Sequence, residues 1–369
     1  MFVATREIRR SLGRFALLTG AVALLVVLLL FFQAVSGTLT SGLTGGFEST
    51  SADVLVFDER ARGNPFASVL APSLVDDVSG LADVVAAAPI ALGVFSGSGP
   101  DGDLDVVIVG GDPSGPSVPG KVTDGRLPET PGEVLFGGSS FEAALAIGDE
   151  VSIGELTLVV VGVTDDAAFN VSPTLYTLFE DYVSLSRERA GAPIDVPISL
   201  VGVAVAADED PAAVAESITA SIDGVVALER GAAVDALPGV GQITQSFSIL
   251  YVLLYIVVTI VTGVFFLILT VQKKDALVLL RAVGASARDI VASVLIQVLI
   301  VVGVGAVLGS VVTAGLLALT TDLFGATLDL TTTAVTVGAI VGLGLAASMG
   351  AVRRVLALEP VSVTQTGGI

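Results

Sequence analysis

The sequence predicts an integral membrane α-helical protein with four transmembrane helices in a 1+3 arrangement. A large extracytoplasmic α+β domain is inserted between helices 1 and 2. Three observations predict this fold class. The 369 residues are 53% hydrophobic, with a mean hydropathy of +0.89. Long apolar runs hold much of that hydrophobicity, and the acidic residues gather between the first two runs. Only 15% of the residues are charged, whereas roughly 25% is ordinary for a soluble domain.

Each apolar run is long enough to cross a membrane. Phe15 to Val35 contains no charged residue and matches the roughly 20 residues that a spanning helix needs. Three more runs lie near the C-terminus. The predicted division is 1–14 cytoplasmic, 15–36 helix 1, 37–245 external domain, 246–271 helix 2, 272–289 cytoplasmic loop, 290–319 helix 3, 320–333 short external loop, 334–352 helix 4 and 353–369 cytoplasmic tail.

The charges predict the orientation in the membrane. The segments 1–14, 272–289 and 353–369 hold ten basic and four acidic residues, and the remaining loops hold seven basic and 33 acidic ones. Short loops rich in Lys and Arg stay in the cytoplasm. We therefore expect a multi-pass protein of the cell membrane with both termini inside. The alternative for the N-terminus is a signal peptide cleaved near Ala34-Val35-Ser36.

The composition excludes several classes of function. With no Cys and no His, the chain has no disulfide, no Cys/His metal site and no Ser-His-Asp or Cys-His catalytic arrangement. A net charge of -20 is unsuited to nucleic acid, which requires clustered cations. No G-x-x-x-x-G-K-[ST] motif occurs, so ATP-driven work would need another subunit. We expect no catalytic residue, cofactor or metal site in this chain.

Short β-branched runs between turn residues predict strands in the external domain. Asp210-Pro211 predicts a helix start, followed by Val214, Ile218 and Ile222 on one face. Between two strands, this helix predicts a β-α-β unit. A second helix is expected after Pro173, from the spacing of Leu175, Leu178, Tyr182 and Leu185. Strands are expected at Val54–Phe57, Leu104–Val109, Glu133–Phe136, Glu155–Val163, Leu200–Ala206 and Val225–Leu228.

One acidic segment is similar to a calcium-binding loop. Asp101, Asp103, Asp105 and Asp112 have suitable spacing, but Val106 stands where the sharp turn requires glycine. We interpret the segment as an acidic surface turn. The other carboxylates are scattered, and no pair suggests a buried acid/base couple.

The loop Gln272–Ile290 predicts a short amphipathic helix at the inner face of the membrane. Lys274, Arg281 and Arg288 are spaced by seven residues, with Leu277 and Leu280 on an apolar side. Gly284 suits the end of that helix, and Ser286 with Asp289 suits the start of the next. The alternative is a basic loop that only fixes the topology.

The stretch Ala276-Leu-Val-Leu-Leu-Arg281-Ala-Val-Gly284-Ala-Ser286 resembles the signature of the MacB/FtsX-like ABC transporter permeases. Residues 132–137, 146–151 and 158–163 are similar to the core of the family's external domain, and Arg353 with Glu359-Pro360-Val361 is similar to its C-terminal ending. The resemblance implies a coupling helix that docks on an ATPase subunit. The contacts expected on that basis are Lys274, Leu277, Leu280, Arg281 and Gly284.

Two pairs of glycines predict close helix packing. Gly305 and Gly309 lie in the third span, and Gly338 and Gly342 lie in the fourth. Such spacing permits close approach of helices in lipid. The two spans pack on each other, or the glycines form a homodimer interface. No span contains a charged residue, so a proton or ion relay is not expected.

These observations favour a permease subunit that couples a cytoplasmic ATPase to movement of the external domain. The family's members export molecules, release lipoproteins or regulate cell-wall hydrolases, so the resemblance selects no substrate. The expected partners are an ABC ATPase, a second permease copy or a paralogue in a dimer, an extracytoplasmic protein and membrane lipids, but no nucleic acid. One alternative is a membrane-anchored receptor or adaptor without an ATPase. Another is a hydrolase that uses external carboxylates.

Overall fold

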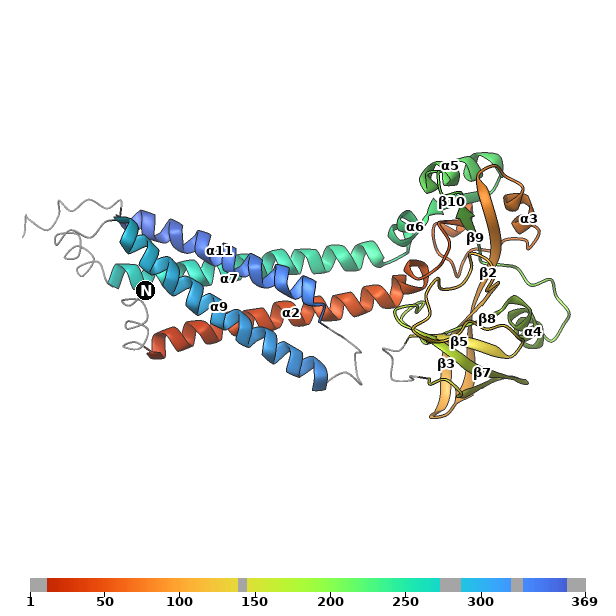
Figure 1. Cartoon of the computed structure of the whole chain (residues 1–369), viewed down its shortest axis with the longest axis horizontal. Helices are drawn as coiled ribbons and strands as arrows, with labels where there is room; N and C mark the ends of the chain where they lie inside the picture. The colour runs from red at the N-terminus through yellow and green to blue at the C-terminus, as the bar shows by residue number, and fades with distance from the viewer. Residues whose placement is uncertain (1–11, 139–144, 273–286, 320–327, 357–369) are drawn as a thin grey trace, which may run out of the picture. The chain divides into compact units, whose positions relative to one another are not determined.

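The structure, a computed structural model, describes residues 12–138, 145–272, 287–319 and 328–356 (Figure 1). The chain divides into two compact units, a helical unit and a sheet unit, and the sheet unit includes Ser36–Gln245. Two long helices have residues in both units, namely α2 (Leu12–Glu48) and α7 (Val240–Gln272). Each unit is described by itself below.

The described residues include four helices that are long and apolar enough to cross a membrane. Besides α2 and α7 they are α9 (Ala287–Leu319) and α11 (Leu330–Leu356). Each holds an 18-residue window of high mean hydropathy, which is 2.9 in α2 and α7, 2.7 in α9 and 1.8 in α11. The predicted 1+3 arrangement around an inserted domain is therefore confirmed. Helix α2 continues to Glu48, beyond the last residue of the predicted span.

One stripe of α2 forms part of the interior of the helical unit. Phe15, Leu18, Val22, Val26 and Leu30 are buried, and their spacing of three or four residues places them on one helix face. The helices also carry exposed apolar side chains, as expected where lipid surrounds them. The buried stripe packs with Val258, Phe266 and Leu269 of α7, with Val298, Val301, Val302 and Ala306 of α9, and with Ile340 of α11.

The sheet unit contains a ten-stranded sheet with the order β10-β1-β9-β2-β3-β8-β5-β7-β4, and β6 pairs with β2 and β7. Its longest strand is β2, whose first half pairs with β9 and whose second half pairs with β3. The strands are β1 (Val54–Asp58), β2 (Val84–Gly99), β3 (Gly102–Gly111), β4 (Asp124–Gly125), β5 (Glu133–Gly137), β6 (Glu150–Ile153), β7 (Leu156–Thr164), β8 (Thr174–Leu178), β9 (Leu200–Val205) and β10 (Val225–Glu229).

We call β1, β9 and β10 the first strand group, and β3, β5, β6, β7 and β8 the second strand group. In the first group, β1 is antiparallel to both β9 and β10, so the outer two strands are parallel to each other. Helix α5 (Pro211–Ser221) connects them, with Asp210 capping its start by accepting from Ala212 N. The expected β-α-β unit is therefore confirmed, with β1 between its two strands.

Both faces of the sheet are buried. Val107 and Val109 of β3 belong to one apolar cluster, and Val106 and Ile108 belong to another, because successive side chains of a strand point to opposite faces. The first, which we call the central cluster, includes residues of both strand groups and Phe47 of α2. On the other face, α3 (Leu74–Ser79) and α5 cover the first group, and α4 (Phe179–Ala190) packs on the second.

The helix expected after Pro173 begins later than its spacing predicts. Thr174–Leu178 form strand β8, and α4 begins at Phe179. Strand β8 pairs with β3 on one side and with β5 on the other. These two pairings override the local helical spacing. Only Tyr182 and Leu185 of the expected helical residues lie on α4.

Every strand expected from the sequence is present within two residues of its expected bounds, but β2, β4, β6 and β8 were missed. Strand β2 contains Pro89, Gly93 and Gly97, and these residues resemble turn signals. Gly93 is required by packing, since a Cβ there would lie 2.9 Å from the ring of Phe95 and 3.0 Å from Tyr182 Oη.

Candidate functional site

The predicted ATPase contacts lie outside the described residues. On either side of them, α7 ends at Gln272 and α9 begins at Ala287. Arg14 Nη1 donates a 2.8 Å hydrogen bond to Gln272 Oε1, which joins the first turn of α2 to the last residue of α7. The residues concerned are Lys274, Leu277, Leu280, Arg281 and Gly284, and Ser286 of the predicted capping box also falls outside.

Two of the four predicted packing glycines lie against α2. A Cβ on Gly305 would lie 3.0 Å from Val22 Cβ, and a Cβ on Gly309 would lie 2.7 Å from both Ala23 O and Val26 Cβ. Real Cβ atoms are essentially never found closer than 3.0 Å to such neighbours. The two glycines therefore let α9 approach α2 closely.

The other two glycines are not brought to α9. A Cβ on Gly338 or Gly342 would meet nothing within 4 Å in the described structure. The close approach of α11 instead uses Gly344, where a Cβ would lie 3.4 Å from side chains of Thr262 and Val302. Sequence reasoning missed Gly344, although it lies two residues from a predicted position. The structure thus separates a packed glycine face of α9 from an open one of α11.

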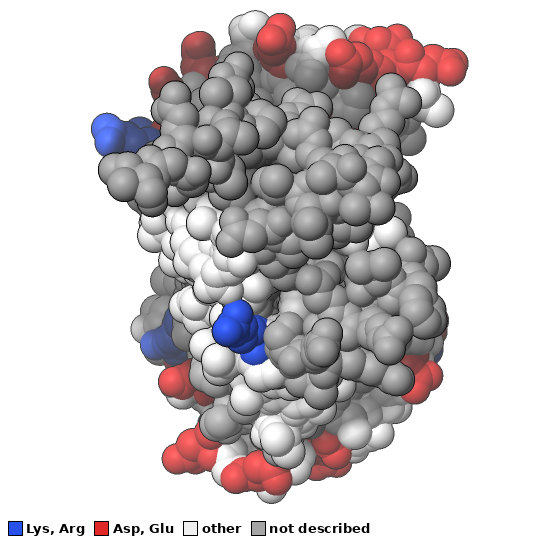
Figure 2. Space-filling view, turned by 90° about the vertical axis from the view of Figure 1, so that its left-hand side faces the viewer, with Lys and Arg blue, Asp and Glu red and all other residues white. Residues whose placement is uncertain are grey.

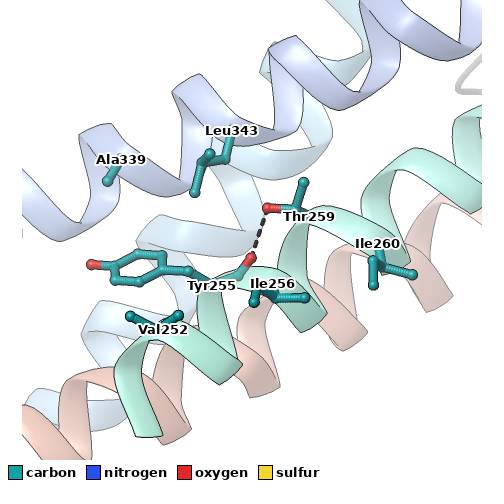
Figure 3. A pocket seen from close by; sticks show the side chains of 7 residues that line it. All are labelled: Val252, Tyr255, Ile256, Thr259, Ile260, Ala339 and Leu343. Atoms are coloured by element: carbon teal, nitrogen blue, oxygen red, sulfur yellow. Dashed lines mark hydrogen bonds between the residues drawn. The ribbon is translucent and has the colours of Figure 1, made fainter. Parts of the chain in front are cut away.

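An apolar groove of about 520 Å³ lies between α7 and α11 (Figure 3). Its lining carries no charged side chain, and the hydroxyl of Thr259 donates a 2.6 Å bond to Tyr255 O of the preceding turn. Apolar groups can therefore occupy the groove without separating an ion pair. It is lined by Val252, Tyr255, Ile256, Thr259, Ile260, Ala339 and Leu343.

The last part of α2 lies against the loop 166–171 of the sheet unit. A Cβ on Gly45 would overlap Asp166 O, and a Cβ on Gly46 would overlap the ring of Phe169. Gly42 is nearly as close, since its Cβ would lie 3.3 Å from Val171. Only glycine permits this approach at two consecutive positions.

Backbone hydrogen bonds hold the same contact. Gly46 N donates to Ala168 O at 2.8 Å, and Val171 N donates to Gly42 O at 2.7 Å. Both bonds join the helix to a loop between β7 and β8. In one bond the helix donates to the loop, and in the other the loop donates to the helix. Buried backbone groups require such partners.

A second loop holds the chain just after α2. Ser51 N donates to Val118 O at 3.0 Å, and Gly120 N donates to Ser49 O at 2.9 Å. Thr50 also forms an isolated antiparallel bridge with Pro119. We call residues 42–51, together with loops 117–120 and 166–171, the α2 clamp. Both of its loops belong to the part of the chain that forms the second strand group.

The backbone of the clamp is strained. Asp166, Asn170 and Val171 have positive φ values of 52°, 55° and 55°. A β-branched residue such as Val is a true outlier in this region, and each such residue costs of order 1–3 kcal/mol unless its surroundings hold it in place. The hydrogen bond from Val171 to α2 is one of the contacts that hold it.

An aromatic cluster supports the clamp from inside. The rings of Phe47 and Phe169 pack edge to face with centroids 5.2 Å apart. Tyr176 is 2% exposed and donates a 2.6 Å bond from its hydroxyl to Ala167 O. Burial raises the pKa of Tyr176, so the phenol remains protonated and keeps this bond. The end of α2 is therefore fixed by its backbone and by its side chains.

Helix α7 enters the sheet unit in a different way. It follows the short helix α6 (Arg230–Ala236), and the turn between them includes Gly239 with a φ of +91°. Leu237 and Val240 are buried in the central cluster. Arg230 N donates to Asp53 O, and Arg230 Nη1 donates to Thr50 O, both at 2.9 Å. These two bonds reach the segment that leads into β1.

The acidic side chains of the described residues do not gather into one site. Figure 2 shows them at several separate places on the visible face, with few basic ones. Arg126 pairs with Glu133, whose pKa is lowered to about 2 by this hydrogen bond, and then by amide donors from Glu129 and Thr130. Buried Asp181 accepts 2.9 Å bonds from Gly132 N and Thr177 Oγ1. Both carboxylates hold the fold together and neither resembles a general acid.

No group of three His, Cys, Asp or Glu side chains that could hold a metal occurs among the described residues. The segment that is similar to a calcium loop turns at residues 100–101 and then forms β3 from Gly102. Asp105 accepts a 2.6 Å bond from Ser96 on β2. The acidic segment is thus the tip of a β-hairpin.

Comparison with known proteins covers both parts of the chain. The model of the MacB-like periplasmic core domain matches residues 15–221, which is more than half of the chain, and the model of the FtsX-like permease C-terminal matches residues 248–360. The chain belongs to the MacB/FtsX-like ABC transporter permeases. Membership of this permease family implies an ATPase partner and suggests a non-catalytic subunit.

Relatives of this permease occur in mycobacteria. An uncharacterized ABC transporter permease of Mycobacterium bovis is 27% identical over 337 residues, and one of Mycobacterium tuberculosis is 28% identical over 332 residues. Each alignment covers 87% of this chain and 88% of the relative. Among solved structures, the periplasmic region of MacB from Actinobacillus actinomycetemcomitans has a TM-score of 0.37 at 14% identity, and covers 50% of this chain and 92% of that one.

Proposed function

We propose that this permease couples a separate cytoplasmic ATPase to movement of its external domain. The movement serves export, extraction of lipids or lipoproteins, or signalling across the membrane. The observation that carries the proposal is the continuity of α2, an unbroken helix from Leu12 to Glu48. Its apolar first part is long enough to cross a membrane, and its last turns are fixed in the α2 clamp. A rigid helix of this kind transmits displacement from one end to the other.

The excess of basic residues supports an orientation with both termini and the loop 272–289 in the cytoplasm. In this arrangement the loop meets the ATPase through Lys274, Leu277, Leu280, Arg281 and Gly284. Closure of the ATPase subunits then pushes on the loop and tilts α7 and α9, which flank it. The bond between Arg14 and Gln272 carries part of that displacement to α2.

The working unit in this proposal is a dimer of permeases, formed with a second copy or with a paralogue, on two ATPase subunits. An extracytoplasmic protein is a further partner, recognised by the external domain. The open face at Gly338 and Gly342 and the apolar groove beside α7 are available for lipid or for another helix. Neither feature selects a substrate.

The proposal is tested by purifying the full chain from its native membrane in mild detergent and identifying any ATP-binding subunit that accompanies it. Arg281→Glu and Gly284→Val are then compared with the unmodified chain. Arg187→Glu is the matched control, because it reverses an exposed charge on α4 of the sheet unit. We expect the two loop variants to lose most of the ATPase, and the control to retain it.

Two results would contradict the proposal. If no ATP-binding subunit accompanies the chain, a receptor or adaptor role replaces it. If an ATPase is found but Arg281→Glu and Gly284→Val both retain it at the unmodified level, the docking role of the loop is wrong.

A further inference from the structure

The turn between β7 and β8 carries a short motif that the proposed function does not use. Asn170-Val171-Ser172 matches the pattern Asn-x-Ser/Thr, in which x is any residue except proline. In domains outside the cytoplasm, asparagines in this pattern accept sugars on the side-chain amide. The sequence contains one other asparagine, Asn64, which is followed by proline. Asn170 is therefore the single candidate acceptor in the chain.

The structure places the motif at the tip of a tight turn. Ser172 N donates to Phe169 O at 3.1 Å, and Asn170 and Val171 both have a φ of 55°. Two positive φ values at the central residues are typical of a type I′ turn. Both central residues are exposed. The motif thus lies on a surface loop, which is the structural context that glycosylation requires.

The side-chain amide of Asn170 is accessible for reaction. It forms no hydrogen bond with the other residues that the structure describes. Ser172 Oγ donates a 3.2 Å bond to Asn170 O, so the hydroxyl of the motif lies beside the acceptor residue. Asn64 differs, because its Oδ1 accepts a 3.0 Å bond from Phe66 N. Asn170 therefore combines the motif with an amide that can react.

The turn by itself explains the asparagine but not the hydroxyl. Asn adopts positive φ more readily than most residues, and Asp or Gly also suits the first central position of such a turn. A type I′ turn sets no requirement for a hydroxyl at the residue after its two central positions. The glycosylation motif accounts for both Asn170 and Ser172.

We propose that Asn170 is an N-glycosylation site. The donor is a sugar whose C1 is joined through oxygen to the phosphate of a membrane lipid carrier, and a separate membrane transferase supplies the catalytic groups. Asn170 Nδ2 forms a bond to C1 as the bond between C1 and the phosphate oxygen breaks. The carrier phosphate leaves with the bonding electrons, and Nδ2 loses one proton to a base of the transferase. Nothing is oxidised or reduced.

This inference rests on the proposed function, because it requires the sheet unit to lie outside the cytoplasm. The sugar is attached to loop 166–171 of the α2 clamp, next to Val171, which is 36% exposed. A bulky, hydrated group at this point covers that apolar side chain. It also keeps other proteins away from the contact between the loop and α2.

The residue after the motif limits the extent of the modification. Pro173 restricts Ser172 to an extended backbone. The motif is therefore stiff, and the transferase must fit it into its own site. We expect chains with and without sugar in one preparation.

The test is mass spectrometry on the full chain purified from its native membrane. Cleavage after Asp and Glu gives fragment 167–180, which contains Asn170, and fragment 60–76, which contains Asn64. Asn170→Asp removes the acceptor nitrogen and keeps a residue suited to positive φ. Ser172→Ala keeps the acceptor and removes the hydroxyl. Ser172→Thr is the matched control, because it preserves the motif, and circular dichroism checks that each variant folds.

We expect fragment 167–180 at the mass of its sequence and also with added sugar residues, and fragment 60–76 at the mass of its sequence alone. The added mass should disappear in Asn170→Asp and Ser172→Ala and remain in Ser172→Thr. The inference is overturned if fragment 167–180 of the unmodified chain carries no sugar. It is also overturned if the added mass remains in Asn170→Asp, since the sugar is then on a hydroxyl group.

A second measurement separates this inference from the proposed function. The chain has no cysteine, so Glu216→Cys at an exposed position of α5 introduces a single thiol. A maleimide that does not cross membranes should label it in intact cells. Labelling without sugar on Asn170 overturns the inference alone, and absence of labelling overturns it together with the proposed orientation. Absence of a co-purifying ATPase contradicts the proposed function and leaves the sugar unaffected.

Discussion

At Gly309, helix α9 passes so close to α2 that no side chain fits between them. In Gly309→Ala the new Cβ would lie 2.7 Å from Ala23 O and from Val26 Cβ. Because one of these neighbours is backbone and the other is the branching carbon of a fully buried valine, neither can rotate away. The two helices must separate, and the packing around Val302 and Ala306 loosens with them.

The size of the effect follows from two opposing contributions. Overpacking of a close-packed interior costs typically about 1–3 kcal/mol. Gly342→Ala is the matched variant on α11, where a Cβ meets nothing within 4 Å, and replacement of glycine within a helix gains about 0.5–1 kcal/mol. Because both variants gain this helix contribution, it cancels in the comparison, and we expect the free energy of unfolding of the two variants to differ by about 1–3 kcal/mol, with Gly309→Ala the less stable.

Equilibrium unfolding of the full chain in detergent, followed by circular dichroism at a helix wavelength, measures this difference. The helices of the helical unit supply most of the signal. If Gly309→Ala unfolds at the same denaturant concentration as Gly342→Ala, α9 and α2 do not pack at this position and the reasoning fails.

Three further predictions concern the sheet unit. Because the pKa of Glu133 is lowered from 4.5 to about 2 by Arg126, its stabilising contribution is complete above about pH 4.5 and is lost as the pH falls towards 2. Glu133→Gln should flatten the acid limb of stability against pH, and an unchanged limb would contradict the pairing. Tyr176→Phe leaves Ala167 O without its donor and should cost about 1–3 kcal/mol in denaturant unfolding; no loss would mean that water replaces the hydroxyl. Asp181→Ala removes the acceptor of two bonds and should cost a similar amount, about 1–3 kcal/mol, with Asp181→Asn less affected.

The helical unit was predictable because its signal is simple. A run such as Phe15 to Val35 has few structures open to it, since a long uncharged segment must bury its backbone polar groups in a helix. The continuation of α2 to Glu48 was not predictable from hydropathy, because Ser36–Glu48 contains glycines and hydroxyl residues. Those glycines are explained only by loop 166–171, which approaches from more than a hundred residues away in the sequence.

Among the strands and at the candidate site, too, features with a local sequence signal were predictable, and features that depend on a distant partner were not. Strands such as Val54–Asp58 were visible as β-branched runs, but β8 lies in a segment with helical spacing and depends on β3 and β5 for its pairing. Gly305 and Gly309 were recognised by spacing, and their partner on α2 was not. The predicted ATPase contacts around Arg281 remain a prediction, since they lie outside the described residues.

The path of the chain through the sheet has a consequence for diversification. The second half of β2, every strand of the second group and α4 occupy one uninterrupted stretch from Ala91 to Ala190. The first group, which is continuous with α6 and α7, is assembled from the residues on both sides of that stretch. The stretch is therefore continuous in sequence and lies between segments of the first group. A chimaera could exchange it with one junction inside β2 and the other before β9. The second strand group could then be replaced while the membrane helices and their connections to the first group stay the same.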